Sequence, residues 1–300
     1  DGVLTSTTTT ANAALPKAGG TMTGNIVMGT NTIGGLKITT TATDNIGLGS
    51  GAVDSITTGD HNVGVGDDAL TANTEGGGNI AIGYQALYTN EGGDGNTALG
   101  YGSLKANTGG DYNTAVGNSA LANTTGGTDG NTAVGWGALA GNLSGSNNVA
   151  MGKGALYAST SSTGNTALGY NTLISNLTAA GNTAVGHEAL FATTGANNTA
   201  VGTNALEANI GGANNIALGY LAGDNITTGD SNIIIGASID APSATADNQL
   251  NIGGWIYGSG GNIGIGVSAP TEALEVSGNI VASGNLTVNG TTTTVSTTNM

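Results

Sequence analysis

The chain has 300 residues, of which 56 are glycine and only 8% are charged. Nineteen carboxylates against four lysines, with no arginine, give a formal charge of −15, which argues against nucleic acids and anionic membrane surfaces as partners because both need clustered basic residues. There is no cysteine, which excludes disulfides and thiolate chemistry, and no apolar run approaches the length of a membrane-spanning helix.

The first segment, residues 1–44, differs from the rest of the chain. A threonine run leads to Pro-Lys-Ala-Gly-Gly-Thr-Met-Thr-Gly-Asn at residues 16–25, with methionines at Met22 and Met28. This text resembles the Gly-Gly-Thr-Met-Thr-Gly segment of bacteriophage tail fibre proteins, which are trimeric. The resemblance implies that residues 1–44 form a tail-fibre-like connector, and the first residues do not have the pattern of a signal peptide.

The central segment, residues 45–236, is a repeat with a period of 17 residues. Each copy has asparagine, then Ile, Val or Thr, then a small residue (Ile234 is the exception), then an aliphatic residue, then glycine. A period this constant predicts one unit stacked on copies of itself, with a short strand in each unit. The asparagines are Asn45, Asn62, Asn79, Asn96, Asn113, Asn131, Asn148, Asn165, Asn182, Asn198, Asn215 and Asn232, and a late copy begins at Asn262.

The fifth position of every repeat predicts a turn that excludes a Cβ atom, through a positive φ or a close backbone approach. Its residues are Gly49, Gly66, Gly83, Gly100, Gly117, Gly135, Gly152, Gly169, Gly186, Gly202, Gly219 and Gly236. A small residue and a leucine follow in most repeats, as in Ala120-Leu121. We expect these leucines and the fourth-position aliphatic residues to stack into ladders that fill the interior. The Asn/Thr/Gly-rich remainder is the predicted loop side.

Stacking is required for stability, because one unit buries about two large side chains against an ordering cost of roughly 1–2 kcal/mol per residue. Two geometries are open. If each chain coils on itself, twelve coils at about 4.8 Å give a shaft of about 55 Å; if three chains intertwine, the shaft approaches about 170 Å. Seventeen residues suffice to close a narrow coil, which favours the first geometry.

The repeat is also similar to the head repeats of trimeric autotransporter adhesins. In those proteins an Asn-x-Ala-aliphatic-Gly motif forms a left-handed parallel β-roll in each of three chains. Their repeats are shorter and carry two such strands. The resemblance implies an all-β homotrimer, and it makes a bacterial surface adhesin or extracellular filament the alternative to a phage fibre.

The last segment, residues 237–300, breaks the period at Pro242 and continues with strand-like, Gly-rich stretches at 250–266 and 274–290. It resembles the sequence that precedes a self-cleaving chaperone of the endosialidase type in phage tail fibres and tailspikes. The resemblance implies a β-rich neck, and the chaperone's serine–lysine machinery has no counterpart in the chain.

Residues suited to catalysis or metal binding are few. His61 and His187 belong to different coils, and the adjacent acids Asp67 and Asp68 have no predicted pocket, whereas glycoside hydrolysis needs two carboxyl groups about 5–10 Å apart in one site. We predict no enzymatic activity and no cofactor. The acids that precede the repeat asparagines suit Ca²⁺ as ligands, but solvated turn acids are the favoured interpretation and no metal site is predicted. They are Asp60, Asp94, Asp111, Asp129 and Asp230.

Aromatic residues recur at the position after the repeat glycine, which His187 shares, so they should form one line along the rod. They are Tyr84, Tyr101, Trp136, Tyr170 and Tyr220. Such a line is either a stacked ladder or subunit contact, or a surface that stacks against host glycans.

Together these features predict an elongated all-β homotrimer: a parallel β-solenoid or β-roll of about twelve coils over residues 45–236, with a connector at 1–44 and a neck at 237–300. The resemblances imply a structural phage tail fibre in the virion, which presents a receptor-binding surface. Its partners would be itself, other tail proteins and a host glycan or receptor, without membrane insertion. The alternative places the chain on a bacterial cell surface.

Overall fold

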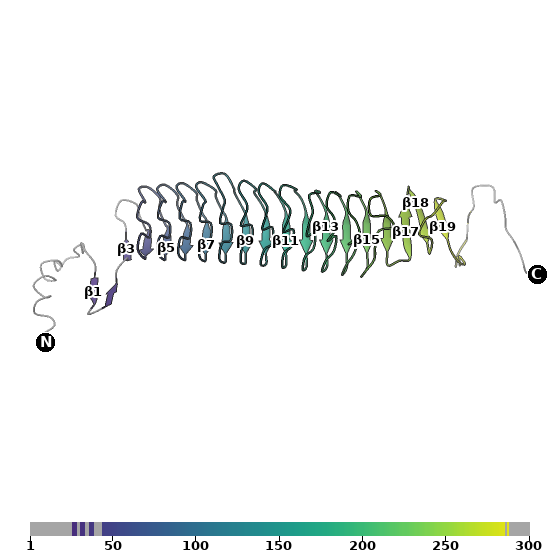
Figure 1. The fold of residues 1–300 in the computed structure, drawn as a ribbon, viewed down its shortest axis with the longest axis horizontal. Coiled ribbons are helices and arrows are strands. Elements are labelled where there is room, and N and C mark those ends of the chain that lie inside the picture. Colours follow the sequence, from purple (N-terminus) through teal and green to yellow (C-terminus); the bar gives the residue numbers. More distant parts are fainter. Residues whose placement is uncertain (1–25, 29–30, 34–35, 39–43, 286, 288–300) are drawn as a thin grey trace, which may run out of the picture.

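The structure is a computed structural model that describes residues 26–28, 31–33, 36–38, 44–285 and 287. Figure 1 shows an elongated rod in which one strand of each coil lies beside the corresponding strand of the next coil. Every element of the described residues is a strand. The predicted fold class, an all-β parallel β-solenoid of about twelve coils, is confirmed.

The coil strands are three residues long and begin directly after the repeat asparagine. They are β4 (Ile46–Leu48), β5 (Val63–Val65), β6 (Ile80–Ile82), β7 (Thr97–Leu99), β8 (Thr114–Val116), β9 (Thr132–Val134), β10 (Val149–Met151), β11 (Thr166–Leu168), β12 (Thr183–Val185), β13 (Thr199–Val201), β14 (Ile216–Leu218), β15 (Ile233–Ile235) and β16 (Leu250–Ile252).

Each coil strand pairs in parallel with the next one along the chain. Between β11 and β12, for example, Thr166 lies opposite Thr183 and Ala167 opposite Ala184. The chain therefore coils on itself, which is the first of the two predicted geometries. Because the register never shifts, equivalent residues of successive coils form straight columns along the rod.

The middle residue of each strand points into the coil, and its two neighbours point outward. Ala98 and Ala150 are fully buried, whereas the fourth-position residues Leu99 and Met151 are 45% and 42% exposed. The prediction that the fourth-position aliphatic residues fill the interior is therefore wrong. A strand with a period of two buries either the third position or the second and fourth, and this narrow coil has room for only a methyl group there.

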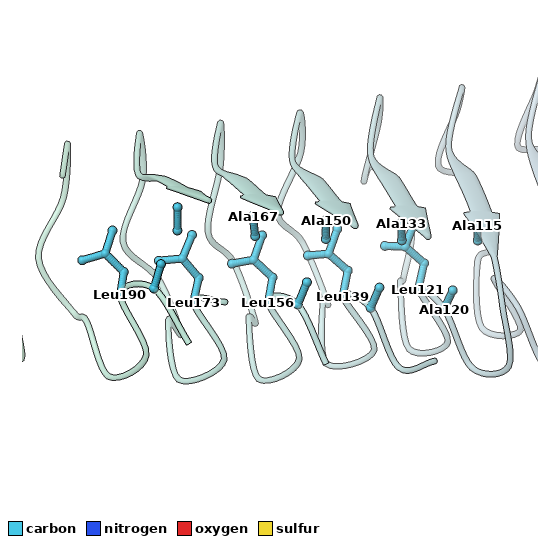
Figure 2. Packing of buried hydrophobic residues seen from close by; sticks show 14 of the residues in the cluster. Ala115, Ala120, Leu121, Ala133, Leu139, Ala150, Leu156, Ala167, Leu173 and Leu190 are labelled. Atoms are coloured by element: carbon cyan, nitrogen blue, oxygen red, sulfur yellow. The ribbon is translucent and has the colours of Figure 1, made fainter. Parts of the chain in front are cut away.

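The interior is filled by one leucine per coil, which confirms that part of the prediction. Figure 2 shows Leu121, Leu139 and Leu156 stacked in a column beside the alanines of the strands, and all three are fully buried. Their backbone is left-handed, with φ of +51°, +53° and +52°. That conformation costs roughly 1–2 kcal/mol for a residue with a Cβ, and burial of the whole leucine side chain offsets it.

The volume of the interior side chains is conserved where the repeat loses its leucine. In the coil of β14 the leucine position is Gly223, and a Cβ there would lie 3.3 Å from side-chain carbons of Leu206, Ile226 and Ile234. Ile226 and Ile234 are fully buried. The isoleucine at position 234 thus occupies the space that the missing leucine leaves.

Other strands border the solenoid at both ends (Figure 1). β3 (Leu36–Ile38) pairs antiparallel with β4, and β17 (Ile256–Ser259) pairs antiparallel with β16. β18 (Asn262–Ile265) pairs antiparallel with β17, and β19 (Leu274–Val276) pairs parallel with β18. β1 (Ile26–Met28) and β2 (Asn31–Ile33) form a separate antiparallel pair. β3 and β17 cover the two edges of the parallel stack, which extends to β16, past Gly236. The tail-fibre-like text at residues 16–25 lies outside the described residues.

Candidate functional site

The repeat asparagines form a buried hydrogen-bonded column that joins every coil to its neighbours. The Asn131 backbone N–H donates to Asn113 Oδ1 at 3.0 Å, and Asn131 Nδ2 donates to the Gly145 carbonyl at 2.9 Å. Asn131 Oδ1 accepts from the Asn148 backbone N–H at 3.0 Å. The column continues to Gln249, whose backbone N–H donates to Asn232 Oδ1 at 2.8 Å. Sequence reasoning located these asparagines but gave them no role.

A second buried polar column was missed. Asn90 Nδ2 donates to Asn73 Oδ1 at 2.8 Å and to the Gly93 carbonyl at 2.9 Å. Thr124 and Ser159 occupy the same position in other coils and are also fully buried. The signal was the recurrence of Asn, Ser or Thr at this position, which the general abundance of these residues obscured.

The fifth-position glycines have both properties that would exclude a side chain. Their φ angles lie between +127° and +141° from Gly49 to Gly236. A Cβ on Gly117 would lie 2.7 Å from the carbonyl oxygen of Gly135 in the next coil. These residues are structural, since they allow adjacent coils to approach at the turn.

The aromatic residues lie in one exposed column, which we call the aromatic column (Tyr84, Tyr101, Trp136, Tyr170 and Tyr220). The rings of Tyr84 and Tyr101 stack with centroids 5.3 Å apart, and Tyr170 stacks on His187 at 5.1 Å. Lys153 Nζ lies 5.5 Å from the Trp136 centroid and 5.7 Å from the Tyr170 centroid. Where members are consecutive, the ring faces cover one another, so a sugar can stack only where the column is interrupted.

The outward-facing fourth positions form a continuous uncharged aliphatic stripe along the whole sheet. Its leucines, Ile82 and Met151 are substantially exposed, from 36% at Leu168 to 45% at Leu99, whereas its valines, Ile235 and Ile252 are half-buried. The stripe consists of Leu48, Val65, Ile82, Leu99, Val116, Val134, Met151, Leu168, Val185, Val201, Leu218, Ile235 and Ile252. A contiguous exposed apolar surface of this extent is typical of an interaction site. Sequence reasoning missed it because it assigned these residues to the interior.

The turn acids bond to the backbone of the preceding coil. Asp94 Oδ1 accepts from the Gly77 N–H at 2.7 Å, Asp111 Oδ1 from the Asp94 N–H at 2.8 Å, and Asp129 Oδ1 from the Asp111 N–H at 2.9 Å. Asp230 Oδ1 bonds likewise to the Ala213 N–H at 2.7 Å. Within the described residues, no group of three or more His, Asp or Glu side chains is arranged to hold a metal ion.

The two histidines lie in separate places, each beside one carboxylate. His61 Nε2 is 3.6 Å from Asp44 Oδ2, and His187 Nδ1 is 3.6 Å from Glu188 Oε2. Asp67 Oδ1 accepts from the Ser50 N–H at 3.1 Å. The structure brings none of these groups together into a catalytic arrangement, within the part of the chain that it describes.

Burial is the main cause that raises the pKa of Asp224 from 3.8 to about 6. A hydrogen bond with Asp240 and electrostatic repulsion by Asp240 and Glu207 contribute to the same rise. The folded state then binds more protons than the unfolded state between pH 4 and 6, so stability falls as pH rises through this window. Asp224→Asn should flatten the fall in melting temperature over that window. Glu272→Gln, an exposed carboxylate, is the control, and an unchanged slope in Asp224→Asn would contradict the assignment.

Comparison with known proteins gives no relative: no family model, curated protein or solved structure matches the chain. A search of the described residues for a helix long and apolar enough to cross a membrane also finds none.

Proposed function

We propose that the chain is the shaft of a fibrous adhesive assembly, in which three copies associate along the aliphatic stripe. The observation that carries this proposal is the stripe itself: an uncharged apolar surface that runs along the rod without interruption from Leu48 to Ile252. An isolated solenoid would leave this surface in water, whereas association removes it from water and is favourable.

The size and charge of the stripe suit self-association. The two outward columns of the sheet extend along every coil strand from β4 to β16, and a standard interface needs roughly 800 Å² per partner. No charged residue stands in either column, although the chain carries a formal charge of −15. Copies can therefore join through this face and keep their carboxylates in solvent. Because every column has the same spacing, identical chains can align in register.

A bacteriophage tail fibre that presents a host-receptor-binding surface fits this architecture best among the candidates. The tail-fibre-like text at residues 16–25 and the neck-like text after Pro242 support that assignment. The second candidate is a bacterial surface adhesin or extracellular filament, which the Asn-x-Ala-aliphatic-Gly repeat favours. In both cases the role is mechanical and adhesive rather than catalytic.

Lysine in the centre of the stripe should dissociate the assembly. We expect the wild-type protein to sediment as a trimer and the Val116→Lys/Val134→Lys variant as a monomer, with association weakened by about 100-fold or more because buried charges would lack partners. Since both side chains point outward, the β-sheet circular dichroism should be retained.

The matched control is Ser161→Lys/Thr163→Lys, which adds the same charge at two exposed loop positions of the next coil and should leave the trimer intact. A wild-type protein that sediments as a monomer at micromolar concentration would contradict the proposal, as would a stripe variant that keeps the mass of the assembly.

A further inference from the structure

The lysines of the solenoid lie beside the aromatic column. Lys153 belongs to the column and lies over the rings of Trp136 and Tyr170. Lys105 occupies the repeat position that Tyr157 occupies three coils later, and Tyr157 stacks on Trp136 with centroids 6.0 Å apart. Lys105 therefore lies in the column adjacent to the aromatic one. Neither ammonium group forms an ion pair with a carboxylate of the described residues.

The aromatic column is interrupted at Asn118, between Tyr101 and Trp136. Tyr101 stacks on Tyr84, which belongs to the preceding coil. Trp136 contacts Tyr157 and Lys153, which both belong to the following coil. The uncovered faces of Tyr101 and Trp136 are therefore directed toward the coil between them, where Asn118 is exposed.

The interruption has the dimensions for one inserted ring. Tyr101 and Trp136 are two coils apart, or about 9.6 Å at a strand spacing of about 4.8 Å. Stacked rings lie about 4.5–7 Å apart, so a ring placed midway would contact both aromatic faces. Both flanking residues are well exposed, Tyr101 at 57% and Trp136 at 50%. Asn118 supplies an amide at the base of the interval, and its Oδ1 accepts from Ser119 Oγ at 2.8 Å.

We propose that this interval binds one sugar ring of an acidic polysaccharide. The apolar faces of the pyranose would lie against Tyr101 and Trp136, the hydroxyl groups would bond to Asn118, and the carboxylate would pair with Lys105. An anionic ligand is favoured because the two lysines of the solenoid flank this interval and are unpaired with carboxylates, on a chain that is otherwise acidic. Lys105 belongs to the coil of Tyr101, and Lys153 belongs to the coil that follows Trp136. The same net charge repels a polyanion from the rest of the rod and confines binding to this patch.

A second interruption provides an internal control. Thr203 lies between His187 and Tyr220 in the same column, without a lysine in the adjacent positions. It offers a similar spacing without the cation. The inference depends on the adhesive part of the proposed function and is independent of how many chains assemble.

The test uses the full-length assembled protein and isothermal titration calorimetry with a galacturonate hexamer, against maltohexaose as the neutral probe. We expect the acidic probe to bind with an affinity that falls as salt rises, and to bind more tightly than the neutral probe. Asn118→Tyr should weaken binding by at least about tenfold, because a tyrosine would fill the interval as the column does elsewhere. Thr203→Tyr should leave binding unchanged, and Lys105→Gln should weaken it and reduce its salt dependence.

The inference is overturned if the acidic probe does not bind, if maltohexaose binds equally well, or if Asn118→Tyr and Thr203→Tyr have the same effect. It is also overturned if Asn118→Tyr changes the sedimenting mass, since the rings would then be subunit contacts. A wild-type protein that binds the acidic probe but sediments as a monomer would instead contradict the trimeric shaft alone.

Discussion

Asn131→Leu should lower the free energy of unfolding by about 1–3 kcal/mol, since it leaves one buried backbone N–H group unpaired. This group is the Asn148 N–H, which loses Asn131 Oδ1, whereas the Gly145 carbonyl loses Asn131 Nδ2 but keeps its hydrogen bond from Asn142 Nδ2. Asn131 is fully buried, so water cannot replace the lost partners. Thermal melting gives the overall effect, and amide hydrogen exchange at Asn148 should show the local loss of protection.

The matched control is Asn118→Leu, an exposed asparagine of the preceding coil, which should change stability by less than about 0.5 kcal/mol. Equal melting of Asn131→Leu and the wild type, with Asn148 still protected from exchange, would show that the column does not hold the coils together.

Asn131→Asp distinguishes the role of the side-chain acceptor of Asn131 from that of its side-chain donor. The carboxylate keeps an acceptor for the Asn148 N–H but places an oxygen against the Gly145 carbonyl, where Nδ2 now donates. Burial raises the pKa of a carboxyl group, so the folded variant would hold a proton that the unfolded chain releases. The variant should therefore lose stability as pH rises above about 4, which is the ordinary carboxyl range.

The repeat made the fold predictable, but it did not determine which strand face is buried. Alternation of β-branched and small residues indicated a strand in each coil, and hydrophobicity favoured Val116 and Val134 as core residues. The structure instead buries Ala115 and Ala133, because the leucine column already occupies the space opposite them. The exchange of small and large residues at Gly223 and Ile234 was the one sequence signal that pairs the third position with the leucine.

Which residues are neighbours on the surface was harder to predict from the sequence than the repeat itself. The aromatic column followed from register alone, because equivalent residues of a constant repeat must stack. The position of Lys105 beside it did not, since this depends on which repeat positions are neighbours around the coil, as the Trp136–Tyr157 contact shows. The left-handed backbone of Leu121 and its equivalents was also unpredictable, because sequence rules place glycine or asparagine in that conformation.

The other large effect is expected at the fifth-position glycines. Gly117→Val should cost several kcal/mol, because φ is +129° and a Cβ would lie 2.7 Å from the Gly135 carbonyl oxygen. The coils of Gly117 and Gly135 would have to separate, although the Gly135 N–H donates to the Val116 carbonyl at 2.8 Å in the native stack. Gly109→Val is the control, since a Cβ there meets no atom within 4 Å.

The position of the substituted glycine along the rod should determine how much of the solenoid unfolds, as much as the severity of the steric clash does. A Cβ on Gly49 would lie 2.4 Å from the Gly66 carbonyl oxygen, a clash similar to that at Gly117. In a linear stack each coil contacts only its neighbours, so Gly49→Val should release the first coil and leave the remainder folded. Gly117→Val divides the rod into two shorter stacks, and hydrogen exchange should show lost protection in the coils on both sides of the substitution. If both variants lost the same amount of protected backbone, the solenoid would unfold as one cooperative unit. The expectation that each coil is stabilised only by its neighbours would then be wrong.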